Sequence, residues 1–468
     1  MRGSPAQSLR PRLLLGASYL LTRQIIGFPV STLGIVVLAR MIGPAAYGTY
    51  VSGFAVYTFL GYLLLPGISP YLISAGKELD RDTVGHAMAL LVSVAAIGAT
   101  TAILAVTTIG ALIDLGGVAA VVIALAPALL LRYGSIIPTV VLERRLDYRR
   151  IALAEMAVQV IQPIVALAVA LLHPDFWAPV SGFWAANLAS AAILAAYVPQ
   201  ALRPVWNLRA MLALAWRSLP YGGSIWVGQL RVLANPMIVG IALGQEAVGV
   251  VALTLRIVNI LGVVGEVGRR VSLAGMGRMS EDRVMLRRFT ERAIEAQILL
   301  VGLPLLIFSF AVPVLSARGL GAAWRGIGLV FPLVAIGFLI GTFSTLPVCA
   351  LAILRRSRAM IINSVSQIVI LFAAAAVLTH LWGIAGYGVA EILAALASMV
   401  GINAAQNLIG NIDWKWPVFY GAILVVGMSW PYTSILAAAP MLLLVASPRA
   451  WRLATRSVTD LRRMSATR

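Results

Sequence analysis

The feature that most constrains this fold is a succession of long apolar runs that fills almost the whole chain of 468 residues. An α-helix needs ~20 mostly apolar residues to cross a bilayer, and the runs have about that length or more. They are continuously apolar, whereas the strands of a membrane β-barrel alternate in hydrophobicity. The runs fall at residues 13–39, 49–73, 83–113, 117–142, 151–172, 176–199, 214–243, 248–274, 290–316, 326–353, 359–379 and 384–408. The sequence therefore predicts an all-α polytopic membrane protein with twelve core spans.

The composition agrees with this prediction and excludes a soluble globule. Hydrophobic residues make up 60% of the chain and charged residues 11%, whereas soluble domains carry about 25% charged residues. The formal net charge is +19, but the basic residues gather in alternate connections, as the positive-inside rule describes. They include Arg144, Arg145, Arg149, Arg150, Arg269, Arg270, Arg355, Arg356 and Arg358. We therefore expect both termini in the cytoplasm and no nucleic-acid partner.

The two ends of the chain need separate interpretations. The first apolar run follows several arginines but extends through Leu38, beyond the ~7–15 residues of a signal-peptide core, so a retained first span is expected. Residues 416–447 are apolar but interrupted by Trp430-Pro431-Tyr432. They fit two short spans, fourteen in all, or a hairpin that only dips into the membrane. The basic tail at 448–468 fits either a helix lying on an anionic leaflet or a frayed end.

A repeat divides the chain into two similar halves. Gly43, Ala46 and Gly48 are matched by Gly244, Ala247 and Gly249, and in both places the two glycines are expected to bracket a tight turn with positive φ. The predicted parts are an N-terminal lobe at 1–210, a C-terminal lobe at 211–410, extra spans at 411–447 and a cytoplasmic tail at 448–468. In transporters with parallel repeats, the substrate site lies between the halves.

The residues around the first turn resemble a known family. Leu38-Ala39-Arg40, Ile42-Gly43-Pro44 and Tyr47-Gly48 are similar to the polysaccharide transporters, the O-antigen and exopolysaccharide flippases of the multidrug/oligosaccharidyl-lipid/polysaccharide (MOP) exporter superfamily. The resemblance implies a MATE-like fold of two six-helix lobes with a central cavity, often with two extra C-terminal helices. It implies transport of a lipid-linked oligosaccharide.

A second resemblance is to the lipid II flippases. The stretch from Thr22 to Phe28 looks like their Arg-x-x-Gly-Phe segment, in which the arginine faces the cavity, and Leu255-Arg256-Ile257 is similar to a second cavity arginine. The pattern departs at Pro29-Val30-Ser31, where lipid II flippases carry an Arg-Asp pair. This departure argues against lipid II itself as the substrate.

Four arginines inside apolar runs are the candidate substrate-binding residues: Arg23, Arg132, Arg231 and Arg256. An arginine at the bilayer centre costs ~2.5–3.5 kcal/mol on the insertion scale, which favours a watery cavity for each. A guanidinium also pairs bidentately with pyrophosphate oxygens and keeps its proton. The alternatives are pairing with a carbonyl near Pro29 for Arg23, and snorkelling to an interface, above all for Arg132.

Two acids and two prolines complete the candidate site. Glu266 precedes Arg269 and Arg270 by one helical turn, so a local ion pair is expected there. Glu391 stands alone in the last core run, as an ion-coupling site or as the partner of a cavity arginine. Pro29 and Pro236 occupy similar places in the first and seventh runs, where helix breaks can free backbone carbonyls for a substrate.

These observations favour a flippase that moves a lipid-linked, anionic glycan of the polyprenyl-pyrophosphate type across the bacterial cytoplasmic membrane by alternating access. No cofactor is expected, since the chain lacks a phosphate-binding ATP loop, and no metal ligands are grouped in the sequence. Expected partners are the glycan substrate, membrane lipids, and a glycan polymerase or glycosyltransferases. The main alternative is a MATE-like ion-coupled exporter of small molecules; a membrane enzyme and a scaffold are further alternatives. The outer connections are short and carry no catalytic constellation, so an enzyme is not expected.

Overall fold

The computed structural model describes residues 5–64, 67–74, 80–112, 114–221, 228–277, 279 and 281–447. Within these ranges the chain forms helices and no strand. Contacts group it into two compact units, Met1–Pro236 and Met237–Arg468. The predicted lobe boundary at residue 210 lies within helix α9, and as a division between lobes it stays a prediction.

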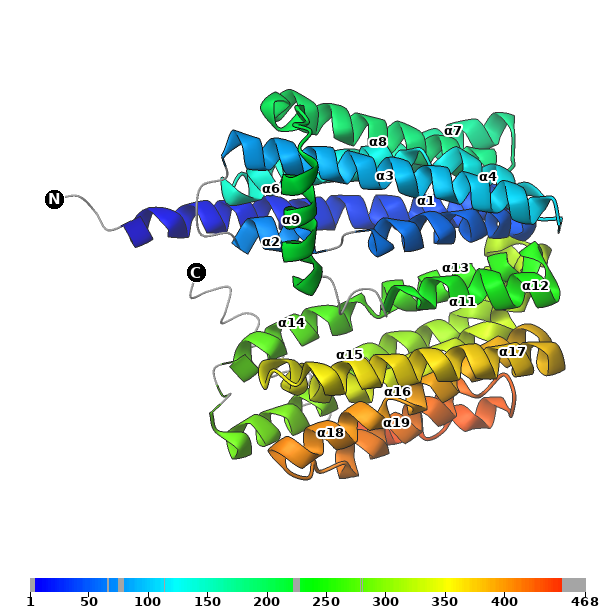
Figure 1. Ribbon diagram of the computed structural model, residues 1–468. Helices are drawn as coiled ribbons and strands as arrows, with labels where there is room; N and C mark the ends of the chain where they lie inside the picture. Colours follow the sequence, from blue (N-terminus) through cyan, green and yellow to red (C-terminus); the bar gives the residue numbers. More distant parts are fainter. Residues whose placement is uncertain are drawn as a thin grey trace. The chain divides into compact units, whose positions relative to one another are not determined.

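The first unit contains a bundle of long helices and several short ones (Figure 1). Its helices are α1 (Pro5–Leu63), α2 (Ile68–Ser74), α3 (Arg81–Gly110), α4 (Gly117–Leu125), α5 (Ala128–Gly134), α6 (Ile136–Arg144), α7 (Tyr148–Leu172), α8 (Trp177–Tyr197), α9 (Leu208–Ser218) and α11 (Arg231–Ala234), with 3-10 turns at Pro199–Leu202 and Leu219–Tyr221. Short α9 packs against α2 and α3 and crosses the other helices in Figure 1.

The second unit has a similar content of helices. A π-helix at Asn235–Val239 leads into it, followed by α12 (Gly240–Leu243), α13 (Gln245–Leu261), α14 (Val263–Gly277), α15 (Arg283–Val314), a π-helix at Leu315–Leu320, a 3-10 turn at Ala322–Trp324, α16 (Gly326–Ile353), α17 (Ser357–Leu396), α18 (Met399–Ile409), α19 (Lys415–Met428), a 3-10 turn at Ile435–Ala438 and α20 (Met441–Ala446). In the most hydrophobic stretch of the segment Ala322–Ile353, which contains α16, 56% of the residues are buried. α16 is therefore a central helix of this unit.

Length and composition give the number of helices that can cross a membrane. Among the described residues eight helices qualify, or nine if the bent pair α13–α14 counts as one span. Two of the eight, Pro29–Ser74 and Ser357–Ile409, contain 46 and 53 residues. At 1.5 Å per residue they measure about 69 and 80 Å, more than twice the ~30 Å hydrocarbon core. Each therefore supplies more than one crossing, and the predicted total of fourteen spans stays a prediction.

The long helices are broken at glycines. Within α1, Gly43 has φ 75° and ψ 169°, which are not helical angles and divide α1 into two helical stretches. Gly244, between α12 and α13, has nearly the same conformation, with φ 83° and ψ 178°. Only glycine adopts such angles without strain. The turn lies at the first glycine of each pair, so the expected bracketing is corrected: Gly48 and Gly249 are buried inside the helices that follow.

Small residues let neighbouring helices pack closely. A Cβ atom on Gly34 of α1 would lie 2.4 Å from Cβ of Pro163 on α7, and one on Gly182 of α8 would lie 2.4 Å from the Gln162 carbonyl oxygen. Close backbone approach at small residues is what stabilises helix pairs in lipid, where the hydrophobic effect between helices is absent. The hairpin of α7 and α8 and its contact with α1 depend on these positions.

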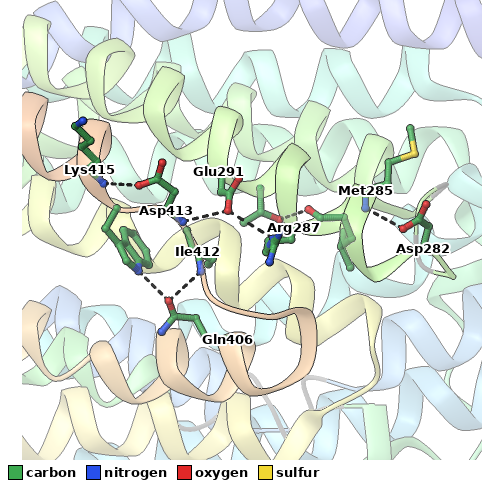
Figure 2. A network of polar contacts seen from close by, with 11 residues as sticks. Asp282, Met285, Arg287, Glu291, Gln406, Ile412, Asp413 and Lys415 are labelled. Carbon is green, nitrogen blue, oxygen red and sulfur yellow. Dashed lines mark hydrogen bonds and ion pairs between the residues drawn. The ribbon is translucent and has the colours of Figure 1, made fainter.

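The C-terminal helices are attached to the second unit by a polar network (Figure 2). The Asp413 N–H donates to the Glu291 carboxylate on α15, at 3.0 Å. The Gln406 side-chain oxygen on α18 accepts from the Ile412 N–H at 3.3 Å and from the Trp414 indole N–H at 2.9 Å. Together these bonds hold the connection that leads into α19. With 14 residues, α19 is about 21 Å long, and whether 411–447 makes two full spans stays a prediction.

Polar side chains cap the starts of four helices. Asp80, Asp147, Asn207 and Asp282 cap α3, α7, α9 and α15 through side-chain oxygens that accept backbone N–H bonds. Such caps satisfy donors that have no partner within the helix. Hydrogen bonds from Thr83 hold the pKa of the Asp80 carboxyl below its usual value. The predicted basic tail at 448–468 lies outside the described residues.

Candidate functional site

Arg132 is the predicted substrate-binding arginine whose surroundings the structure defines best. It lies on α5, half-buried inside the first unit. Its guanidinium carbon is 4.6 Å from the ring centroid of Tyr62 and 5.8 Å from that of Tyr57. A cation over an aromatic face gains about 0.5–2 kcal/mol, more when both groups are desolvated. The two rings therefore stabilise a charge that the apolar helix would otherwise expose to lipid.

The backbone beside Arg132 is adapted to this arrangement. A Cβ atom at Gly61 would lie 2.9 Å from the guanidinium, so a larger residue there would displace the end of the Arg132 side chain. The neighbouring Tyr133 is buried, and its hydroxyl donates to the carbonyls of Gly61 and Leu64. Arg132 and Tyr133 thus both bind the end of α1. Whether Arg132 binds substrate or snorkels to an interface stays a prediction.

The other three arginines have different environments. Arg256 is exposed on α13 of the second unit, and Arg231 is exposed on α11 of the first. Arg23 belongs to α1, but its side chain lies outside the described residues. Both side chains are thus exposed within their units, and the roles of all three arginines as substrate-binding residues stay predictions.

The two candidate acids also differ. Glu266 receives two bonds from Arg269, at 2.6 and 2.7 Å, and one from Arg270 at 3.1 Å. The predicted local ion pair at i,i+3 and i,i+4 is therefore present. Glu391 is only 5% exposed on α17, where its backbone packs against Gly337 of α16. A charged group is seldom buried so deeply unless it is paired, and its assignment to ion coupling or to charge pairing stays a prediction.

The predicted helix breaks fall at some of the prolines and not at others. α1 continues through Pro29, whereas Pro236 lies in the π-helix Asn235–Val239. π-helical turns inside longer helices are frequent at functional sites. A further break, at Trp382 and Gly383 in α17, separates the last two predicted core runs. Hinge roles for Pro29, Pro236, Gly43, Gly48, Gly244 and Gly249 stay predictions.

Some amide side chains inside the bundles contact a neighbouring helix. The Asn363 side-chain oxygen on α17 accepts from the Gly401 N–H of α18 at 3.1 Å. Gln159 of α7 packs against Gly27 of α1 so closely that a Cβ atom there would clash with it. Interhelical contacts of this kind are the common use of amides in membrane bundles. The bond to Gly401 explains the position of Asn363 without a sugar hydroxyl, whereas the buried Gln159 oxygen accepts no hydrogen bond from the described residues.

Sequence reasoning missed several residues of interest. Glu295 on α15 is 3% exposed, and Gln297 on the same helix donates to the Gly265 carbonyl at 3.4 Å. Their places inside a long helix were visible in the sequence, since an acid within an apolar run is itself a signal. The rings that hold Arg132 gave no such signal, because they lie some seventy residues away along the chain.

The chain matches one family model and several solved structures. Residues 37–329 match the family model described as "Polysaccharide biosynthesis protein", which is more than half of the sequence. The chain belongs to this family of polysaccharide biosynthesis proteins. The matched region starts in α1 and ends in α16, so it includes both glycine turns. A search of curated proteins gave no match to the sequence.

Solved structures show the fold of this family member. The lipid II flippase MurJ in an inward closed conformation has a TM-score of 0.69 and 11% identity, covering 96% of this chain and 99% of that one. An inward-facing multidrug resistance MATE family transporter of the MOP superfamily has a TM-score of 0.62 and 13% identity, covering 83% of this chain and 98% of that one. An outward-facing structure of such a transporter has a TM-score of 0.55 and 15% identity, covering 84% of this chain and 95% of that one. The predicted all-α, MATE-like fold is confirmed.

Proposed function

We propose that this protein is a flippase for a lipid-linked, anionic oligosaccharide or polysaccharide precursor of the polyprenyl-pyrophosphate type. The observation that carries the proposal is the membership of the polysaccharide biosynthesis family, in a chain with a transporter fold. A glycan assembled on a lipid carrier in the cytoplasm must cross the membrane before use outside. A membrane protein of this family in which no group of catalytic residues is expected fits that step. The transfer is expected to need no cofactor.

The proposed mechanism is alternating access, with lobes at 1–210 and 211–410 that open in turn to the two sides of the membrane. Arg23 and Arg256 would hold the pyrophosphate, and Arg231 is a further accessible guanidinium. Arginine suits this role because its planar fork binds two phosphate oxygens and stays charged. Glu391 is the candidate for ion coupling or for pairing with a cavity arginine, whereas Glu266 is occupied by Arg269 and Arg270.

The proposed location is the cytoplasmic membrane of a bacterium, with both termini in the cytoplasm. This follows from the basic connections, which the positive-inside rule places on the cytoplasmic side. A glycan polymerase and glycosyltransferases are the expected functional partners, since they act before and after the transfer of the lipid-linked glycan.

Complementation tests the proposal. Cells lacking the gene would receive Arg23→Ala, Arg256→Ala or the control Arg318→Ala, an exposed arginine in the π-helix Leu315–Leu320. Loss of a charged hydrogen bond of ~1.5–3 kcal/mol corresponds to about a 10- to 150-fold loss of binding. We expect outer-leaflet glycan to fall sharply in the first two variants at normal membrane protein level, and to be unchanged in the control.

Full activity in both variants would reject the arginine site. If deletion of the gene then left the glycan intact but raised sensitivity to cationic drugs, the MATE-like ion-coupled exporter would take the place of the flippase. Such an exporter would depend on an acid instead, and Glu391→Gln would abolish its activity.

A further inference from the structure

The second unit contains a pocket with both polar and apolar lining residues, and none of the four predicted cavity arginines lines it. Its volume is about 380 Å³, within the range of ~300–1,000 Å³ common for small-molecule sites. Three helices line it: Arg269 comes from α14, Ser344, Thr345 and Cys349 from α16, and Asn363 and Gln367 from α17. All three helices belong to one unit, so the pocket is formed within it.

Arg269 gives the pocket its charge. Its Nε–H donates to one Glu266 oxygen at 2.7 Å and one Nη2–H donates to the other at 2.6 Å. Arg270 shares the same carboxylate, so the three groups carry a net charge of +1. A guanidinium has five N–H donors, and Glu266 accepts from two of those of Arg269. The carboxylate therefore fixes the orientation of the guanidinium and leaves three donors for an anion.

The neutral polar side chains of the lining have restricted roles. Ser344 and Thr345 both donate to the Gly341 carbonyl within α16, at 2.9 and 3.4 Å, so their oxygens remain as acceptors. The Asn363 oxygen accepts from the Gly401 N–H, which leaves its amide N–H₂ as the donor. Gln367 adds an amide with both functions. With Arg269, the Asn363 and Gln367 amides therefore offer N–H donors to the oxygens of an anion.

We propose that this pocket binds a phosphate ester, with Arg269 as the residue that contacts the phosphate. Charge-assisted bonds from arginine to phosphate are about twice as strong as neutral hydrogen bonds, and amide donors complete the coordination of its oxygens. The ester is either the headgroup of a lipid or a soluble phosphorylated molecule. The proposal does not depend on the transport function, since it concerns the binding of an anion to one unit.

The chain carries its own probe for this site. Cys349 is the only cysteine in the sequence, and it lines the same pocket as Arg269. It is 7% exposed, so its alkylation is slow and is followed over a long reaction time. A ligand bound to the guanidinium in this pocket would cover the thiol. The rate at which Cys349 is alkylated reports whether the pocket is occupied.

The experiment measures alkylation of Cys349 in the purified full-length protein by N-ethylmaleimide, followed by intact mass. Dihexanoyl phosphatidic acid, glycerol 3-phosphate, inorganic phosphate and the uncharged dihexanoyl glycerol are added in parallel. At ten times the dissociation constant about one tenth of the sites remain free, so the rate should fall about tenfold. We expect protection by the phosphate-bearing probes and none by dihexanoyl glycerol.

The pattern of protection identifies the source of the ester. Protection by phosphatidic acid alone assigns a lipid headgroup, whereas protection by glycerol 3-phosphate as well assigns a site open to soluble esters. If only inorganic phosphate protects, or if no phosphate-bearing probe does at millimolar concentration, the proposal is wrong. Equal protection by dihexanoyl glycerol would also overturn it, because the charge would then play no part.

Variants separate Arg269 from its neighbour. Arg269→Gln should abolish protection while Cys349 remains reactive. The matched control is Arg270→Gln, which removes a guanidinium that also binds Glu266 but is 75% exposed and outside the lining; it should keep protection. Gln367→Glu, which adds a negative charge to the lining, provides a second test if Arg269→Gln does not fold. Protection retained in both Arg269→Gln and Gln367→Glu would contradict the proposal.

Discussion

Single residues show how this protein keeps charge inside apolar helices. Arg132 lies against the faces of Tyr57 and Tyr62, whereas Arg269 lies against a carboxylate at Glu266. The first arrangement leaves the charge uncompensated but covers it with polarisable rings, and the second compensates it with an acid one turn away. An arginine in a membrane helix therefore does not by itself indicate a ligand; its neighbours decide how much of the guanidinium is free.

The pairing of Arg132 with aromatic rings gives a prediction. Tyr62→Leu removes the ring nearest to the guanidinium and should destabilise the protein by about 0.5–2 kcal/mol. Tyr62→Phe keeps the ring face and should have a much smaller effect. The measurement is the apparent Tm of each purified variant, followed by tryptophan fluorescence. A loss of stability as large in Tyr62→Phe as in Tyr62→Leu would show that the hydroxyl group, and not the ring face, holds Arg132.

At the scale of the helices, glycines decide where the chain bends and how closely its segments pack. α17 bends at Gly383, which has φ 59°, and Gly386 follows at the start of the next helical stretch. A Cβ atom on Gly386 would lie 1.9 Å from the Leu378 carbonyl oxygen. The atom in the way belongs to the backbone, which cannot move aside as a side chain can. The bend at Gly383 and the close approach of Gly386 to the Leu378 backbone therefore depend on each other.

We expect Gly386→Ala to be strongly destabilising, by about 3 kcal/mol or more, because a well-packed backbone must shift to accept the methyl group. Gly328→Ala is the matched control, since a Cβ atom at that position in α16 meets nothing within 4 Å. Replacing a helical glycine by alanine there should be neutral or stabilising by up to ~1 kcal/mol. Thermal unfolding in detergent and the yield of folded protein check both. Equal stability of the two variants would reject the close contact at Gly386.

The network of Figure 2 gives a second prediction at this scale. Gln406→Leu removes the oxygen that accepts from the Ile412 N–H and from the Trp414 indole N–H. Leaving buried donors without a partner costs about 1–3 kcal/mol each. We expect faster hydrogen exchange in α19 and faster proteolysis at 410–414, with little change in α7 and α8. Gln406→Glu, which keeps acceptor oxygens, should resemble the unmodified protein in both assays. Similar exchange in α19 for all three proteins would contradict the anchoring role of Gln406.

At the scale of the whole molecule, the sequence predicted features that depend on near neighbours. The apolar runs predicted the helical class, the repeated glycines predicted turns at Gly43 and Gly244, and the spacing of Glu266 and Arg269 predicted their ion pair. Contacts between distant segments could not be predicted this way. Tyr57 and Tyr62 approach Arg132 only because α1 and α5 pack together, and the pocket at Arg269 needs three separate helices. No local pattern in the sequence predicts contacts between such distant segments.

The predicted orientation in the membrane can be tested on the whole chain. Basic connections should face the cytoplasm because moving arginines across the bilayer is costly. The connection between α3 and α4, with Asp114, and the one between α7 and α8, with Asp175, lack lysine and arginine and should face outward. The connection between α16 and α17 carries Arg355 and Arg356 and should face inward. Single cysteines placed in a Cys349→Ser background, with glycan export checked for each, distinguish the two sides.

An impermeant maleimide added to intact cells should label Asp114→Cys and Asp175→Cys, and should label Arg356→Cys only after the membrane is permeabilised. The control for expression is labelling of all three variants in permeabilised cells. Labelling of Arg356→Cys in intact cells would reverse the predicted orientation and place the basic connections outside. Labelling of only one of the two aspartate positions would mean that an odd number of crossings separates them. Since α4 to α7 lie between these positions, that outcome would contradict the interpretation of Gly117–Arg144 and Tyr148–Leu172 as two complete spans.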